Sequence, residues 1–204
     1  SRVPTEKILK LLDTFTLTYE KTVEGQALDI NWRGAKDFTI EKYLQIVELK
    51  TAYYLTCGMV GGAVVAGASE EVIQKLWELG RSIGPAFQIR DDLIDLTQGK
   101  GRGGQIGSDI KEGKASFLYA YTLVKARPQE RSRLIEIMLK PREKTADGEV
   151  QEVLDLYKKY GAITYAQDYA EGLVNKAYQT IEELPVEDKE TFRAIATFMA
   201  QRKA

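Results

Sequence analysis

The sequence has 204 residues, 44% of them hydrophobic, which is enough for one sizeable core and at most two small domains. The formal net charge is −1 and no basic stripe runs along the chain, so nothing suggests a nucleic-acid partner. The sequence contains no histidine, which excludes serine–histidine and cysteine–histidine catalysis and histidine-ligated metal sites within these residues.

Almost every segment shows the apolar spacing of helices, and few show strand-like alternation. The pattern predicts an all-α chain that forms a single helical domain over residues 1–204. The first helix is expected over 4–30, beginning at Pro4 and Thr5, and the second over 37–68, with Thr39 as its N-cap. The third is expected over 69–97, and Pro85 should kink it. Further helices are predicted over 116–126, 128–140, 148–184 and 186–204.

The stretch from Thr51 to Ser69 carries no charge and is almost long enough to span a bilayer. It contains four glycines and very little Leu or Ile. We therefore expect no transmembrane span, but a helix lined with small residues and buried among other helices. The chain's single cysteine, Cys57, cannot form an internal disulfide, which predicts a reducing, cytoplasmic compartment.

The segment FQIRDDLID at 87–95 places three carboxylates within five positions, in a part of the chain that otherwise reads as an apolar helix. Helical spacing gathers Gln88, Asp91, Asp92 and Asp95 towards one side of the helix, where the like charges repel one another. Carboxylate ligands suit hard ions such as Mg2+, which usually shares its remaining positions with waters and substrate phosphates. A nearby cation is therefore expected, unless this face points into water.

A loop rich in glycine and charge follows at 98–115 and carries Lys100, Arg102, Asp109 and Lys114. Upstream, Lys50 and Thr51 stand at the charged end of the uncharged stretch. Lysines beside a Mg2+–diphosphate complex would bind phosphate oxygens. From the charge pattern alone, this interpretation and a solvated acidic helix end followed by a polar linker are about equally supported.

The segments FQIRDDLID and GSDIKEGKASF resemble the second aspartate-rich region of the trans-isoprenyl diphosphate synthases, the polyprenyl synthetase family that includes farnesyl and geranylgeranyl diphosphate synthases. ELKTAYY at 48–54 resembles the Lys-Thr element of that family. VEGQALDI at 23–30 resembles its Gly-Gln-x-x-Asp element, with Gly25, Gln26 and Asp29. The elements occur in the family's order, and the chain resembles the C-terminal portion of the family.

The resemblance implies an isoprenoid synthase-type helical bundle that lacks the N-terminal helices, and a prenyltransferase. In the implied reaction, an allylic diphosphate ionises with the help of Mg2+ and condenses with isopentenyl diphosphate. The resemblance also makes Asp91 the principal metal ligand, with Asp92 and Asp95 shaping the water shell and second sphere of the ion. Lys50 and Lys114 would contact the diphosphate, and Thr51 and Gln88 would lie near the cation. Tyr54 would face the same cavity or pack in the core.

Two departures from the family pattern stand out. Gln105 occupies the position of a family lysine, so that either Lys100 or Arg102 replaces this lysine or one phosphate contact is lost. The family's first aspartate-rich motif and the arginine pair that follows it are absent from these residues. Product chain length therefore cannot be predicted, because it depends on residues next to that motif.

Three interpretations remain open. The chain could be the C-terminal part of a synthase, in a homo- or hetero-oligomer whose site is completed by a chain that carries the first motif. It could instead be a non-catalytic regulatory subunit of a heteromeric synthase, or another diphosphate-binding helical protein such as a relative of terpene cyclases. A C-terminal part should expose an apolar face, whereas a regulatory subunit should be well behaved by itself.

Overall fold

The computed structural model of the chain describes residues 3–97 and 106–201. These ranges are helical and contain no strand, so the all-α prediction is confirmed for them. The helices are α1 (Thr5–Asn31), α2 (Ile40–Val47), the π-helical segment η1 (Glu48–Ala52), α3 (Tyr53–Ala66), α4 (Glu70–Thr97), α5 (Ser108–Lys111), α6 (Phe117–Lys125), α7 (Pro128–Met138), the 3-10 turn η2 (Arg142–Lys144), α8 (Asp147–Lys159), α9 (Ala162–Glu183) and α10 (Lys189–Gln201).

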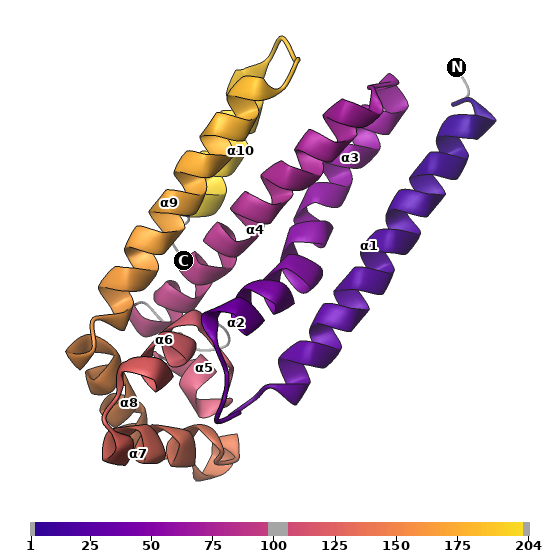
Figure 1. The fold of residues 1–204 in the computed structure, drawn as a ribbon. Helices are drawn as coiled ribbons and strands as arrows, with labels where there is room; N and C mark the ends of the chain where they lie inside the picture. Colours follow the sequence, from indigo (N-terminus) through magenta and orange to yellow (C-terminus); the bar gives the residue numbers. More distant parts are fainter. Residues whose placement is uncertain (1–2, 98–105, 202–204) are drawn as a thin grey trace.

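The long helices α1, α3, α4 and α9 lie side by side in this order, and α10 packs against both α9 and α4 (Figure 1). The short helices α5 to α8 gather at one end of this array, beside the C-terminal end of α4. Helix α4 packs against α3 on one side and against α9 on the other. The aspartate-rich segment therefore lies where the long helices meet the short ones.

Several predicted helix boundaries match the structure. The first helix begins at Thr5, and the Thr39 side chain caps α2 by accepting a hydrogen bond from the backbone of Lys42. The third predicted helix continues through Pro85 to Thr97. The prediction of one helix over 148–184 was wrong, because the chain breaks between α8 and α9 at Gly161, whose φ of 72° is left-handed.

The predicted second helix consists of α2, η1 and α3, which follow one another without a loop. The five residues of η1 include Lys50 and Thr51, and short π segments of this kind often occur at functional sites. Two glycines allow η1 to approach its neighbours. A Cβ on Gly25 of α1 would lie 2.5 Å from the backbone nitrogen of Lys50, and one on Gly84 of α4 would lie 2.6 Å from the Cβ of Ala52.

Two clusters of buried apolar side chains form the core of the described residues. One joins α2, α6, α7 and α8 to the C-terminal half of α4 and the beginning of α9. The other joins α3 and α10 to the N-terminal half of α4 and the end of α9. Since α4 and α9 take part in both clusters, they connect the aspartate-rich end of the molecule to the rest of the array.

The uncharged helix α3 is only half buried. Val60 and Val64 lie in the core, but Gly58, Gly62 and Val65 are exposed, so the expectation of a fully buried helix holds for one face only. None of the helices in the described ranges is long and apolar enough to cross a membrane.

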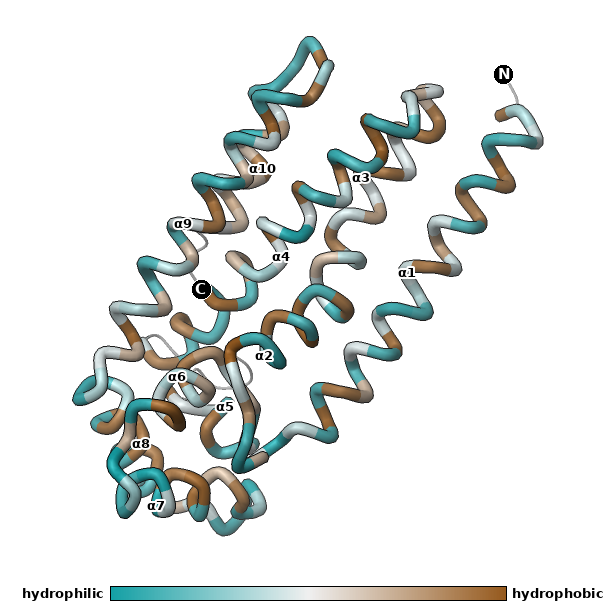
Figure 2. Tube along the Cα trace, viewed as in Figure 1, coloured by the Kyte–Doolittle hydropathy of each residue, from teal (hydrophilic) through white to brown (hydrophobic). Residues whose placement is uncertain are grey.

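Hydrophobic residues recur among polar ones along α1 (Figure 2), and several of them are exposed. Six of them form a row with helical spacing, and each is at least 44% exposed: Ile8, Leu12, Phe15, Tyr19, Val23 and Ile30. Helix α1 packs against η1, α2 and α3, and part of the row borders this contact, since Val23 and Ile30 line a hollow together with Lys50 and Tyr54. We call these six residues the α1 stripe. Exposed apolar residues that gather in this way often mark a contact with another element.

Candidate active site

A cavity of about 330 Å3 lies at the junction of α1, α2, η1, α4 and the loop around α5. Acidic, basic and polar side chains line most of it: Asp29, Arg33, Tyr43, Lys50, Thr51, Gln88, Asp91, Asp109, Glu112 and Lys114. Ile46, Val47 and Ala115 complete the lining. The fold thus brings together residues from four separate sequence segments, among them five of the predicted site residues.

Asp92 is buried behind this cavity, with an exposure of 2%. Its Oδ1 accepts hydrogen bonds from Nζ of Lys114 at 2.8 Å and from Nε2 of Gln88 at 3.3 Å. Its Oδ2 accepts bonds from the Tyr43 hydroxyl at 2.9 Å and from the backbone N–H of Phe117 at 3.4 Å. Both oxygens of this carboxylate are therefore bound to protein groups.

Asp95 is completely buried and organises the loop after α4. Its Oδ1 accepts a bond of 2.5 Å from the Ser108 hydroxyl, and its Oδ2 accepts one of 3.1 Å from the backbone N–H of Asp109. Its backbone carbonyl accepts a bond from the N–H of Gly107. These contacts hold α5 against the end of α4 and so place Asp109 and Lys114 at the cavity.

Asp91 differs from its two neighbours because its side chain is half-buried and lines the cavity. Nε2 of Gln88 lies 3.3 Å from its Oδ2, and Oε1 of Gln88 accepts a bond of 3.4 Å from the Thr51 hydroxyl. A chain of contacts thus runs from Thr51 in η1 through Gln88 to Asp91. Of the three predicted metal ligands, Asp91 is the one that lines the cavity.

Two lysines reach the cavity from different elements. Nζ of Lys50 donates to Oδ2 of Asp29 at 2.8 Å, and Nζ of Lys114 donates to Asp92 and, at 2.9 Å, to Oδ2 of Asp109. Burial tends to lower the pKa of Lys114, but the charges of Asp92 and Asp109 outweigh it and raise this pKa above its usual range. Lys114 therefore carries a positive charge at any physiological pH.

The residues around Asp91 fit a magnesium ion that shares its coordination with a ligand. Within the ranges that the structure describes, no three carboxylates converge to hold a metal by themselves. Mg2+ commonly takes one or two protein carboxylates and completes its shell with waters and phosphate oxygens. Asp91 lines the cavity together with two lysines that would attract such phosphates.

Some predicted residues lie outside the described ranges, namely Lys100, Arg102 and Gln105. Other lining residues were not among the predicted site residues. Arg33 follows α1 and adds a third cation to the lining, but no motif marks it. Tyr43 stands seven residues before Lys50, two helical turns away, and this spacing could have indicated that both face the same side.

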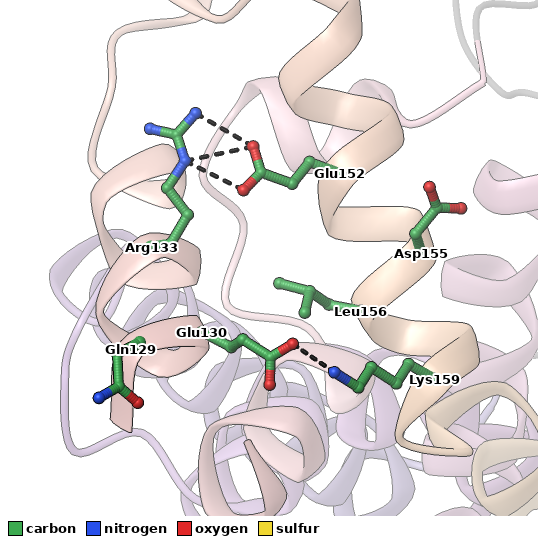
Figure 3. A pocket seen from close by; sticks show the side chains of 7 residues that line it. All are labelled: Gln129, Glu130, Arg133, Glu152, Asp155, Leu156 and Lys159. Carbon is green, nitrogen blue, oxygen red and sulfur yellow. Dashed lines mark hydrogen bonds and ion pairs between the residues drawn. The ribbon is translucent and has the colours of Figure 1, made fainter. Parts of the chain in front are cut away.

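A second cavity, of about 390 Å3, lies between α7 and α8 (Figure 3). Arg133 bonds the Glu152 carboxylate there, and Lys159 pairs with Glu130. These groups are exposed or only partly buried ion pairs that neutralise each other locally, and none of the predicted site residues lines this cavity. The cavity at Asp91 is the candidate site because it gathers five of the predicted site residues.

Comparisons with known proteins show what the chain is similar to. A family model described as polyprenyl synthetase matches residues 2–157. A short chain isoprenyl diphosphate synthase from Methanothermobacter thermautotrophicus is 36% identical over 185 residues, which cover 90% of this chain and 56% of that protein. A geranylgeranyl diphosphate synthase from Saccharolobus solfataricus is 31% identical over 198 residues, which cover 95% of this chain and 59% of that protein.

Solved structures give the same result. A crystal structure of geranylgeranyl pyrophosphate synthetase from Pyrococcus horikoshii matches with a TM-score of 0.84 and 30% identity, over 100% of this chain and 62% of that one. A geranylgeranyl pyrophosphate synthase from Corynebacterium glutamicum, complexed with isoprenyl diphosphate and magnesium, matches with a TM-score of 0.88 and 25% identity, over 98% and 57%. The chain therefore spans between half and two thirds of the length of these relatives.

Proposed function

We propose, on the premise that this chain belongs to the polyprenyl synthetase family, that it supplies the diphosphate-binding half of a trans-prenyltransferase active site. The family predicted from the sequence is confirmed, as is the all-α fold of its members. The observation that carries the proposal is the cavity in which Asp91 lies beside Lys50 and Lys114. A carboxylate for Mg2+ and two fixed cations are what a bound diphosphate requires.

The proposed substrates are an allylic diphosphate and isopentenyl diphosphate. The C–O bond of the allylic diphosphate breaks, and its electron pair leaves with the diphosphate. The double bond of isopentenyl diphosphate attacks the resulting carbocation, and loss of a proton restores a double bond. Negative charge builds on the leaving group, so Lys50 and Lys114, already held by carboxylates, would stabilise it with little reorganisation.

Mg2+ held by Asp91 would supply further charge neutralisation at the leaving diphosphate. Asp92 and Asp95 would act in the second sphere, since their oxygens already bind protein groups. Thr51 and Gln88, which contact each other at 3.4 Å, would lie near the carbocation and help to orient the departing proton. Lys100 or Arg102 would take the place of the family lysine at Gln105.

We further propose that a segment carrying the first aspartate-rich motif of the family completes the site and covers the α1 stripe. A shallow apolar surface beside the stripe is lined by Val23, Ile30, Tyr54 and Lys50, among others. Because Lys50 also lines the candidate site, a segment seated on the stripe would reach the site directly. Such a segment could belong to a partner chain, which would make the enzyme a homo- or hetero-oligomer.

The second candidate function is a non-catalytic regulatory subunit of a heteromeric synthase. The exposed α1 stripe, a surface on which a catalytic partner would pack, favours this possibility. The site geometry favours catalysis, because a purely structural subunit has no need for Asp91 and two lysines around one cavity.

Two smaller proposals concern the domain organisation and the compartment of the chain. Residues 1–204 would form one domain, because α4 and α9 take part in both core clusters. The protein would be cytoplasmic, because its single cysteine, Cys57, is a buried free thiol that suits a reducing compartment.

The test is turnover of labelled isopentenyl diphosphate with dimethylallyl or geranyl diphosphate and Mg2+. The purified chain is assayed alone and together with an N-terminal segment of a family member that carries the first motif. We expect longer prenyl diphosphates from the mixture and none from either part alone. Asp91→Asn should abolish this turnover. No product from the mixture, although the two parts bind each other, would contradict catalysis and support the regulatory role.

A further inference from the structure

Tyr43 on α2 contacts Asp92 on α4, 49 residues further along the chain. Both side chains are buried, with exposures of 2% each, and the hydroxyl donates to Oδ2 of Asp92 at 2.9 Å. The direction of this hydroxyl is fixed by packing, since the Tyr43 ring meets the ring of Phe117 edge to face at 5.5 Å between centroids.

Oδ1 of Asp92, the other oxygen of the same carboxylate, holds the ammonium of Lys114 at 2.8 Å. Asp109 holds it from a second direction at 2.9 Å, and the Lys114 side chain keeps an exposure of 18% at the cavity. An ammonium has three donors. Among the residues that the structure describes, these two carboxylates are its hydrogen-bond acceptors, which leaves one donor for a ligand in the cavity.

Without the Tyr43 hydroxyl, Oδ2 of Asp92 would keep only the longer bond of 3.4 Å from the backbone of Phe117. The carboxylate could then rotate, and the ammonium that it holds would be less well placed. A group that binds a ligand must be held close to its productive geometry by the contacts behind it.

We propose that Tyr43 is a positioning residue, which orients Asp92 through its hydroxyl and thereby holds the Lys114 ammonium at the mouth of the cavity for a phosphate group of the substrate. This inference rests on the proposed function, because it assigns Lys114 to a diphosphate. It gives the buried tyrosine a role that packing alone does not require, since a phenylalanine would fill the same space.

The first test is a double-mutant cycle on the binding of inorganic diphosphate with Mg2+, measured by calorimetry. The variants are Tyr43→Phe, Lys114→Met and the two combined. We expect Tyr43→Phe to weaken binding about 10-fold, which is typical when the group behind a binding residue is lost. In the Lys114→Met background the same change should weaken binding by less than about 2-fold, since its effect passes through Lys114. Equal losses in both backgrounds, or no loss from Tyr43→Phe, would overturn the inference.

Tyr119→Phe is the matched control. Tyr119 is also completely buried, and its hydroxyl donates to the backbone carbonyl of Ala35 at 3.0 Å, away from Asp92. Like Tyr43→Phe, this change removes one buried hydroxyl, but it should leave diphosphate affinity unchanged. A similar loss of affinity in both variants would mean that general destabilisation, and not positioning, explains the result.

The second test needs no ligand and therefore separates this inference from the proposed function. In 15N spectra of lysine ammonium groups, Lys114 should give a signal that exchanges slowly with water, assigned by its loss in Lys114→Met. The signal should persist in Tyr119→Phe and broaden or vanish in Tyr43→Phe. A signal unaltered in Tyr43→Phe would overturn the positioning role. A signal that responds as expected in a chain that binds no diphosphate would instead overturn the proposed function.

Discussion

Nζ of Lys50 donates a hydrogen bond of 2.8 Å to Oδ2 of Asp29, which joins the π segment η1 to the end of α1. The Asp29 side chain is only 9% exposed, whereas that of Lys50 is 35% exposed and lines the candidate site. The ion pair therefore both stabilises the contact between two helical segments and directs a cation towards the cavity.

Asp29→Asn should lower the free energy of unfolding by about 1 kcal/mol, because the half-buried Lys50 loses its charged acceptor. Urea denaturation followed by circular dichroism measures this change. Asp37→Asn is the control, since Asp37 forms a comparable but exposed pair with Lys42. It should produce no measurable change. Equal effects of the two variants would show that the Lys50–Asp29 pair has no special structural role.

Gly25→Ala should destabilise the protein by about 1–3 kcal/mol, because the added methyl group would lie 2.5 Å from the backbone nitrogen of Lys50 and force α1 away from η1. Gly172→Ala on α9 is the matched control. Apart from its own stretch of helix, no atom lies within 4 Å of the added Cβ, so the change should stabilise the helix by up to about 1 kcal/mol. Thermal unfolding of both variants distinguishes them. A stabilising Gly25→Ala would mean that the two segments do not pack as closely as the structure shows.

The α1 stripe should bind the segment that completes the site. Phe15, which is 56% exposed, lies in the middle of the stripe. Phe15→Glu should therefore reduce the binding of an apolar fluorescent dye to the chain and weaken association with the N-terminal segment of a family member. Val124→Glu is the control, because Val124 on α6 is 70% exposed and lies outside the stripe. Unimpaired association of Phe15→Glu would exclude the stripe as the contact surface.

Stability should decrease at alkaline pH. Burial raises the pKa of Tyr119 and of Tyr157 well above the usual value of about 10. A group whose pKa is higher in the folded state than in the unfolded chain stabilises the fold fully below the unfolded pKa. This contribution is lost as the pH rises further. The contribution of these two tyrosines to the free energy of unfolding should thus stay constant up to about pH 9 and fall above about pH 10. Denaturation across this range, with tyrosinate absorbance in parallel, tests this; ionisation before unfolding would contradict it.

The helical pattern of the sequence predicted much of the fold because apolar spacing is a local property. The π segment η1 was not predictable, since the spacing continues through α2 and α3 without a break signal. The break at Gly161 was missed for a related reason. A lone glycine within a long helical pattern can belong to the helix or end it, and its left-handed φ shows only in the structure.

The aspartate cluster illustrates what spacing cannot decide. Helical geometry brings Asp91, Asp92 and Asp95 towards one side, but it does not tell which of them reaches the cavity. That depends on groups distant in sequence. Tyr43 and Lys114 bind Asp92, and Ser108 binds Asp95, so that Asp91 is the carboxylate of the three that lines the cavity. Residues such as Tyr43 become visible only when the helices are packed.

The most direct test of the central claim is a calorimetric titration of the chain with inorganic diphosphate, with and without Mg2+. We predict binding that requires Mg2+ and is lost in Asp91→Asn, with helix content unchanged. Asp155→Asn, at the cavity between α7 and α8, should bind like the unaltered chain. Binding that is unaffected by Asp91→Asn, or that occurs equally without Mg2+, would contradict the account and leave the aspartate-rich segment with a structural role alone.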